Sequence, residues 1–445
     1  MPSFRPKVIV CSLLLVWCSP AMAQETALLP ELVVTATRSS TVSERVPAAV
    51  TVVEAEDIAA QGATRLGDAL EQVPSLYLRG GAFGLSQGTQ GTSSMSLRGI
   101  DQSRTLLLLD GQPLQDAGSG KVNWRMPFVA DIERIEVVPG AYSALYGSNA
   151  IGGVINIISK RPERREIDMR IRRGWSDAEG TDASLYFRDR LDERWGIVAG
   201  IGYQDRASYV NEFVVKTPSC PPPPAPCTPG IPVSGAQPTT TRDGTPAYMV
   251  GDLGRTPWRT LNATAKLFHD LDARSALYAA ISHQQTEQRH TPFTAYLHDA
   301  SGSTVSSGTL DIDGQRVVLS DYDFTLFSFQ PLHEANTQIR AGYDGTVGEG
   351  LLLKAEIAGM QRAYRYALAS PTATWDSGSG TLADTPNHAL DANVQLSFPL
   401  GARHLMVGGV ALHQDAVDQR LLALSSWRDP SSATGVNGGY HGRSS

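Results

Sequence analysis

The amino-acid sequence predicts a small α+β domain at residues 44–162, followed by antiparallel transmembrane β-barrel strands at residues 163–445. Short apolar runs and one helix-like run make up the first region, and Gly-rich or polar turns separate them. From Glu166 onward, apolar and polar side chains alternate, as in strands with one face toward lipid and one toward a lumen. After the N-terminal segment, no apolar run reaches the roughly 18 residues of a membrane helix. A membrane form of this chain would therefore be a β-barrel.

Residues 1–23 have the pattern of an export signal. Arg5 and Lys7 precede the apolar run Val8–Trp17, and Ala21-Met22-Ala23 fits the small-residue rule for cleavage. Removing these two cations and no acidic residue changes the formal net charge from −7 to −9. A chain this acidic is not expected to have nucleic acid as its main partner.

Two cysteines remain after the export signal, Cys220 and Cys227, on either side of a Pro-rich stretch. An exported chain meets an oxidising compartment, so we predict a disulfide between them in an outer loop. A metal site is the weaker interpretation, because two thiols without a nearby histidine do not complete four ligands.

The small domain begins with short regular elements. Thr64 is expected to cap a helix through Val73, whose residues Leu66, Leu70 and Val73 form one apolar face, and Pro74 ends it. Asp110-Gly111 is a tight-turn signal after an apolar strand. The other expected elements are strands at Val50–Val53, Met95–Arg98 and Leu106–Leu109, and a helical turn at Phe128–Ile132.

The domain ends in the run Glu133–Pro162, around which the chain is organised. It holds two apolar strands, Ile135–Val138 and Val154–Ile158, with a segment of Gly and small residues between them. Glycines there permit close packing and positive φ. The run holds no nucleophile, metal-ligand cluster or phosphate-binding loop.

Alternation predicts about nine strands in the second region. Short connections at 191–194, 269–274, 345–349 and 399–402 take turns with long ones, the asymmetry of outer-membrane barrels. Residues 322–329 also alternate, but an additional strand would break the up-and-down order, so we assign them to a long loop. The long loops disfavour a soluble β-sandwich. The expected strands lie near 166–174, 184–190, 195–203, 260–268, 275–283, 336–344, 350–366, 387–398 and 403–412.

Several of these segments together resemble the plug domain of TonB-dependent outer-membrane receptors. The matching pieces are Ile132–Val138, Ser143–Gly147, Ala150–Ile158, Leu97–Gly99 and Leu107–Leu114. The chain departs from the family pattern at Pro139–Tyr142, where an Arg-Gly-Pro is usual. The resemblance implies a plug at residues 44–162 inside a barrel of about twenty-two strands.

The resemblance also assigns the segment 24–43 to the periplasm. Within it, Glu31–Ala36 resembles the TonB box, the peptide by which such receptors engage the energy-transducing protein TonB. Its residues are Glu31, Leu32, Val33, Val34, Thr35 and Ala36. An extended segment of this kind binds by adding a strand to a partner's sheet edge. The alternative is an ordinary edge strand of the following domain.

Two stretches of the plug, 80–94 and 115–124, have neither periodicity nor much charge. By resemblance they are apical loops that face the ligand, and the alternative is plain surface loop. The side chains expected to contact a ligand are Phe83, Gln87, Asp116, Lys121 and Trp124.

Nine strands are too few to enclose the plug. Nine strands close at a diameter of about 18 Å and twenty-two at about 44 Å, whereas a plug of this size has a diameter of about 35 Å. We therefore expect that the barrel is incomplete and that this chain is the first part of a receptor.

The expected function is active transport of a scarce, large ligand across the outer membrane, most commonly an iron–siderophore complex in this family. Cobalamin is an alternative because Leu32–Ala36 resembles the box of that receptor, and haem is another. Passive porins and adhesins need no energy-coupling segment. We find no catalytic constellation, no cofactor and no metal site. His283, His290 and His298 are expected to be solvated loop histidines rather than ligands.

Overall fold

The computed structural model of the chain contains no helix, among the residues it describes, that is long and apolar enough to span a membrane. The described residues are 32–33, 41–42, 49–78, 95–115, 120, 122, 124–174, 179–210, 212–220, 227–228, 230–325, 332–348, 350–401 and 404–444.

The N-terminal domain is built on a five-stranded sheet with the order β3-β9-β10-β7-β8. The strand β10 (Gly153–Ser159) lies at its centre, antiparallel to β9 (Ile132–Pro139) and parallel to β7 (Thr105–Leu109). These are the two strands of the predicted organising run and the predicted apolar strand. The remaining elements are β3 (Thr51–Glu54), α1 (Ala55–Ala60), α2 (Leu66–Leu70), β4 (Leu76–Leu78), β5 (Met95–Leu97), β6 (Ile100–Asp101), β8 (Gln112–Pro113) and α3 (Ser143–Tyr146).

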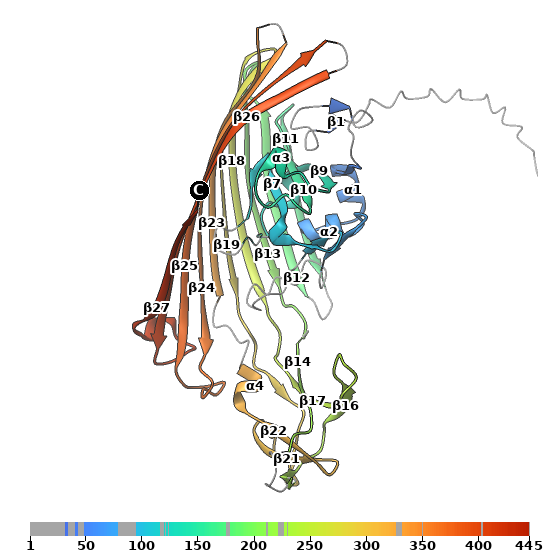
Figure 1. Ribbon diagram of the computed structural model, residues 1–445, viewed down its shortest axis with the longest axis vertical. Coiled ribbons are helices and arrows are strands. Elements are labelled where there is room, and N and C mark those ends of the chain that lie inside the picture. The colour runs from blue at the N-terminus through green and yellow to red at the C-terminus, as the bar shows by residue number, and fades with distance from the viewer. Residues whose placement is uncertain are drawn as a thin grey trace, which may run out of the picture.

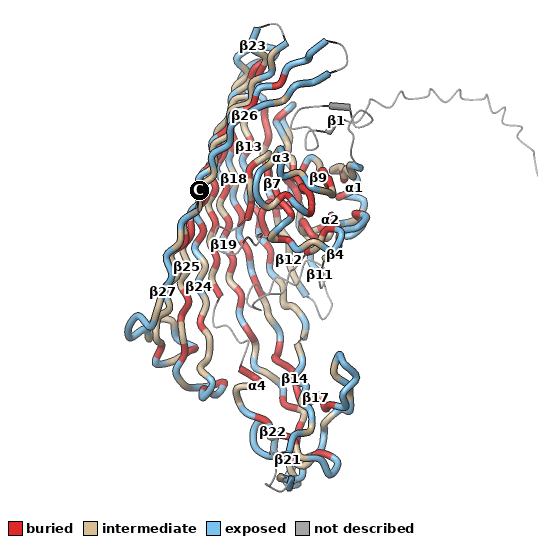
Figure 2. Tube along the Cα trace, viewed as in Figure 1, coloured by how far each residue is buried: buried red, intermediate tan, exposed pale blue. Residues whose placement is uncertain are grey.

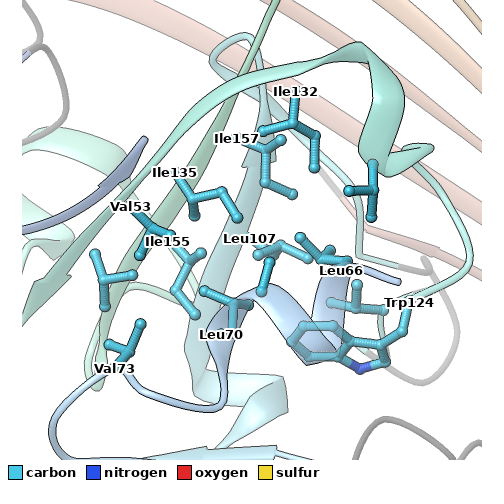
Figure 3. Close-up of a cluster of buried hydrophobic side chains, with 14 of the residues drawn as sticks. Val53, Leu66, Leu70, Val73, Leu107, Trp124, Ile132, Ile135, Ile155 and Ile157 are labelled. Atoms are coloured by element: carbon cyan, nitrogen blue, oxygen red, sulfur yellow. The ribbon is translucent and has the colours of Figure 1, made fainter. Parts of the chain in front are cut away.

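One face of this sheet forms the domain's hydrophobic core with α2 and the loop before β9 (Figure 3). Leu66 and Leu70 of α2 pack toward Ile135, Ile155 and Leu107 of the sheet. All five side chains are fully buried, which gives roughly 1.5–3 kcal/mol of transfer free energy for each. The core therefore rests on residues that the apolar periodicity already identified.

The helices differ from the prediction. The expected helix from Thr64 to Val73 is only the five-residue α2, and its N-cap is Arg65 rather than Thr64. The Asp68 carboxylate accepts hydrogen bonds from both the Thr64 and the Arg65 backbone N–H groups, so it takes the capping role. A second short helix, α1, was not predicted, because its six residues are too few for a periodic signal.

The C-terminal region forms a single ten-stranded antiparallel wall in up-and-down order (Figure 1). Nine strands coincide with the predicted ones, and the tenth, β27, was missed because its Gly-rich sequence hardly alternates. Its backbone pairs with β26 all the same. The wall strands are β11 (Glu166–Gly174), β12 (Gly180–Arg190), β13 (Trp195–Arg206), β18 (Trp258–Asp272), β19 (Ser275–Gln288), β23 (Leu332–Val347), β24 (Leu351–Ala369), β25 (Gly380–Leu400), β26 (His404–Leu424) and β27 (Ala433–Ser444).

Most wall strands are longer than the alternation predicted. β25 and β26 each have 21 residues, whereas a strand crosses a bilayer in about 9–11 residues. Alternation is enforced only where one face meets lipid, so it fades where the strands continue beyond the bilayer.

The two longest connections fold into an outer module at the long-loop end of the wall (Figure 1). Its core includes Val250, Leu297, Leu310, Val317 and Phe324. The stretch 322–329, assigned to a loop, begins within the helix α4 (Asp321–Thr325) and belongs to no wall strand among its described residues. The strands of the module are β14 (Phe213–Lys216), β15 (Ile231–Pro232), β16 (Gln237–Thr240), β17 (Pro246–Asp252), β20 (Thr294–Ala295), β21 (Gly308–Ile312) and β22 (Gln315–Leu319).

Candidate functional site

The N-terminal domain lies against one face of the ten-stranded wall (Figure 1), and the residues buried along the wall are concentrated on the strands behind it (Figure 2). Burial alternates from Leu332 to Arg340 of β23, where Glu334, Asn336, Gln338 and Arg340 are buried while Ile339 is 58% exposed. On this strand the face toward the domain is therefore lined by polar side chains, and Ile339 lies on the opposite face.

The turn between β7 and β8 brings a carboxylate to this contact. Asp110 and Gly111 both have positive φ, 49° and 86°, as the predicted tight turn requires. The Asp110 side chain accepts hydrogen bonds from Ser159 N and Ser159 Oγ at 2.7 and 2.8 Å. From the wall, Arg340 donates to Asp110 Oδ2 at 2.7 Å and to the carbonyl of Leu109 at 3.1 Å.

These contacts set the charge of Asp110. Burial by itself raises the pKa of this carboxyl, but the Arg340 and Lys266 cations and the hydrogen bonds from Ser159 outweigh it. Together they lower the pKa to about 2, so Asp110 is a carboxylate at any physiological pH.

A second ion pair, with both side chains buried, lies beside the first, in which the Asp110 side chain is 24% exposed. Asp131 ends the short 3₁₀ turn before β9, and Lys266 of β18 donates to its Oδ2 at 2.5 Å. Arg188 of β12 lies 3.9 Å from its Oδ1 and donates to the carbonyl of Ala130 at 2.8 Å. The Asp131–Lys266 and Asp110–Arg340 pairs are called here the ion-pair row.

Toward the short-turn end, Glu356 of β24 collects three partners. It accepts hydrogen bonds from Gln112 at 3.2 Å and from Tyr278 at 3.1 Å, and it pairs with Lys354 at 3.1 Å. Gln112 belongs to β8, so this cluster also holds the N-terminal domain to the wall.

Toward the long-loop end, Arg125 of the N-terminal domain reaches the wall. Its guanidinium lies 4.6 Å from the Trp258 ring centroid, a cation–π contact, and donates to Gln288 at 3.3 Å. On the wall itself, Arg362 pairs with Glu334 at 2.6 Å with both side chains buried.

A cavity of about 840 Å³ lies on the short-turn side of the ion-pair row, between the domain and the short-turn half of the wall. Asp110, Arg134 and Lys160 line it from the domain, and Lys266 and Glu356 line it from the wall. Its walls are charged with both signs, so it is suited to polar contents.

Most of the predicted apical contact residues lie outside the described residues: Phe83, Gln87, Asp116 and Lys121. Trp124 is described, and the role expected for it is wrong. It is 2% exposed, packs in the hydrophobic core (Figure 3) and lies with its indole N–H 3.3 Å from Gln102 Oε1. An indole in an apparently featureless loop gave no sequence signal of burial.

Of the predicted TonB box, Leu32 and Val33 form the strand β1 (Leu32–Val33), which pairs antiparallel with β2 (Thr41–Val42). Glu31, Val34, Thr35 and Ala36 lie outside the described residues. The pairing shows that part of this segment adopts an extended conformation that completes a sheet, the conformation that strand addition needs.

The predicted pair Cys220 and Cys227 is disulfide-bonded in the outer module, with Cα atoms 5.0 Å apart. The three histidines do not gather. His283 lies within β19 and contacts Thr337 at 2.8 Å, His290 is buried, and His298 contacts the Tyr296 carbonyl. No group of three potential ligands that could hold a metal ion is found in the described part of the chain.

Sequence reasoning did not single out the ion-pair row. A usable signal was present, since Lys266 and Arg340 stand at lumen-facing positions of alternating strands, where a buried cation requires a partner. The partners themselves, Asp110 and Asp131, are 230 and 135 residues away, and nothing local identifies them.

The N-terminal domain is similar to a known family of domains. Residues 42–154 match the family model of the TonB-dependent receptor plug domain. The N-terminal domain is a TonB-dependent receptor plug domain. The iron-regulated outer membrane virulence protein of Vibrio cholerae is 35% identical over 176 residues, covering 37% of this chain and 26% of that protein.

Solved receptors share the architecture of plug and wall. A mutant ferric enterobactin receptor from Pseudomonas aeruginosa superposes with a TM-score of 0.58 at 17% identity, covering 93% of this chain and 55% of that receptor. The unliganded ferric citrate transporter gives a TM-score of 0.58 at 14% identity, covering 89% and 51%. The chain thus spans about a quarter of the curated relative and about half of these receptors, and its wall is a partial barrel.

Proposed function

We propose that this chain supplies the plug and ten wall strands of an outer-membrane receptor that actively imports a ferric siderophore complex. The observation that carries the proposal is the plug held to the lumen side of the wall by ion pairs, among them Asp110–Arg340 and the buried pair Asp131–Lys266. A passive pore gains nothing from a folded domain fastened inside it. A plug fastened by polar contacts, by contrast, can be displaced and can return.

The iron–siderophore cargo is inferred from the relatives. One is named as iron-regulated, and the structural neighbours are named for ferric enterobactin, ferripyoverdine and ferric citrate. Transport breaks no covalent bond, so the chain needs no catalytic residue for this role. Apical contacts from Phe83, Gln87, Asp116 and Lys121 belong to the proposal.

The energy source in this proposal is the periplasmic protein TonB, which takes hold of Glu31–Ala36 as an added strand. We test it with Val34→Pro in a receptor in which this wall is continued to closure. Proline removes one backbone donor and blocks strand pairing, whereas Val34→Ala keeps the donor and serves as the matched control.

Cells carrying each variant are given ⁵⁵Fe-labelled ferric enterobactin, ferric citrate and ferripyoverdine in separate assays. We expect surface binding of one chelate to persist in Val34→Pro while its uptake stops, with Val34→Ala close to the parent. Uptake that survives Val34→Pro refutes the energy-coupling role, and a parent that takes up none of the three chelates refutes the cargo class.

A further inference from the structure

The lumen-facing side of β18, β19, β23 and β24 is a largely polar surface, called here the polar wall, in which Ala280, Ala358 and Met360 are apolar exceptions. Strand register places inward residues in rows that run across these strands. Across β18, β19, β23 and β24, the first row holds Asn262, Gln284, Asn336 and Arg362. The second holds Thr264, Ser282, Gln338 and Met360, and the third holds Lys266, Ala280, Arg340 and Ala358. Polar side chains therefore continue from the long-loop half of the wall down to the ion-pair row.

Buried polar atoms on this wall lack hydrogen-bond partners in the described part of the chain. They are Asn262 Nδ2, Asn336 Oδ1, Gln338 Nε2 and Oε1, and the Tyr364 hydroxyl. Asn336 is 2% exposed and Gln338 only 1%. A buried polar group without a hydrogen-bond partner destabilises the folded state, so several of them on one surface call for a functional explanation.

The wall strands β12 and β13 meet the plug differently. Phe128 and Ala130 of the plug pack on Tyr186 and Val198 in a hydrophobic cluster. A Cβ at Gly202 would come within 2.8 Å of the Phe128 ring, so this ring packs directly on the backbone of the wall. Gln204 Nε2 also donates to the Thr64 carbonyl at 2.8 Å. This side packs closely through apolar side chains, as expected of a fixed contact.

The polar wall also leads to space. On the short-turn side of the ion-pair row, the cavity of about 840 Å³ is lined by Lys266, Tyr278 and Glu356 of the same strands. Three features therefore follow one another along the wall from its long-loop end to its short-turn end. Hydrogen-bonding groups without partners come first, the two ion pairs of the ion-pair row come next, and the charged cavity comes last.

We infer that cargo crosses the barrel along the polar wall, and that the ion-pair row is the gate on this route. The inference rests on the proposed transport function and specifies its path. The unsatisfied amides and hydroxyl supply partners to a cargo rich in hydroxyl, amide or carboxylate groups as it loses water. Breaking Asp110–Arg340 and Asp131–Lys266 joins this surface to the cavity, while the packed contact on β12 and β13 stays in place as the pivot.

The first test measures opening without needing transported cargo as the readout. Gln338→Cys places a thiol on the polar wall, and Ser184→Cys places one at a buried lumen-facing position of β12 as the matched control. Both are introduced into the closed receptor, with ferric enterobactin, ferric citrate and ferripyoverdine supplied together so that the receptor is occupied. Labelling by a charged methanethiosulfonate reagent is timed in energised cells and in cells treated with an uncoupler.

Energising should raise the labelling rate of Gln338→Cys by about tenfold or more and leave Ser184→Cys unchanged, because only the polar wall opens. An equal rise at both cysteines, a rise at Ser184→Cys alone, or no rise at Gln338→Cys overturns the inference. Chelate uptake by the parent receptor is measured in parallel. Its absence refutes the proposed function, whereas uptake with an unresponsive Gln338→Cys refutes only the route.

The second test locks each side of the plug in turn. Gln112→Cys with Glu356→Cys is joined by a short reducible bis-thiol linker on the polar-wall side, since the parent side chains hydrogen-bond at 3.2 Å. Thr64→Cys with Arg206→Cys is the control on β13, where the parent side chains lie 3.5 Å apart. The first link should abolish uptake until it is reduced, with surface binding intact, and the second should leave uptake in place. Uptake that survives the first link, or that both links block, contradicts the route.

Discussion

Removing Lys266 tests whether the wall holds the plug through the buried ion pair. Its side chain is 3% exposed and that of Asp131 is 7% exposed, so neither charge is well solvated. Among the described residues, the Asp131 carboxylate in Lys266→Met keeps one ion-pair partner, Arg188, whose nearest nitrogen is 3.9 Å away. The variant fills a similar volume, and the perturbation is therefore chiefly electrostatic.

The magnitude follows from the burial. Breaking a buried pair by deleting one partner costs about 3–5 kcal/mol, and the remaining Arg188 places this case near the lower end. A loss of about 3 kcal/mol corresponds to roughly a 150-fold increase in the population of the opened plug. The double variant Lys266→Met/Asp131→Asn removes both charges and should recover most of this loss.

The assay is native-state hydrogen exchange of the β10 backbone amides, which lie at the centre of the plug sheet. Arg173→Met is the matched control, because the Arg173–Glu179 pair is 55% and 51% exposed and contributes less than about 1 kcal/mol. Equal protection of β10 in Lys266→Met and in Arg173→Met would refute the claim that this pair anchors the plug.

The effect should also depend on pH. Burial raises the pKa of Asp131 above its ordinary value, and the Lys266 cation opposes that rise. Deleting Lys266 raises the pKa of Asp131 in the folded state further. Between the unfolded and folded pKa values, the folded state then binds a proton that the unfolded state releases. The destabilisation in Lys266→Met should therefore shrink as pH falls below the folded pKa and grow as pH rises through it.

Three further outcomes are expected. The pKa of Asp110 is about 2 against an ordinary 3.8, which corresponds to about 2 kcal/mol of plug stability. This stability is present above pH 4 and is lost as the pH falls from 4 to 2. Acid titration of plug unfolding should show the loss in the parent and not in Asp110→Asn. Gly153→Ala should destabilise the plug by roughly 2–4 kcal/mol in urea unfolding, because Gly153 has φ +144° and the new Cβ would lie 2.5 Å from the Val138 carbonyl oxygen. Gly62→Ala is the control and should cost less, because its new Cβ would have nothing within 4 Å. Mass spectrometry of unreduced protein should find the Cys220–Cys227 peptides two hydrogens light, and Cys220→Ser should loosen the outer module by about 2–3 kcal/mol without changing exchange in the plug; two freely alkylated thiols would contradict this.

The local sequence alone determined much of the architecture. β11 was predicted to the residue at 166–174, because its alternation of Ile167, Met169 and Ile171 with charged residues is enforced by the different media on its two faces. The turn at Asp110-Gly111 was likewise readable, since few residue pairs accept two positive φ angles. Such features depend on neighbours within a few positions, and the sequence states those directly.

Other features depended on residues far apart in the chain. Trp124 belongs to the core rather than to a ligand-facing loop because of how α2 and the sheet pack around it. β27 exists because β26 offers a free backbone edge, not because of its own pattern. The ion-pair row joins Asp110 to Arg340 across 230 residues, and only the docking of the plug on the wall brings the two charges together and removes the water that would otherwise screen them.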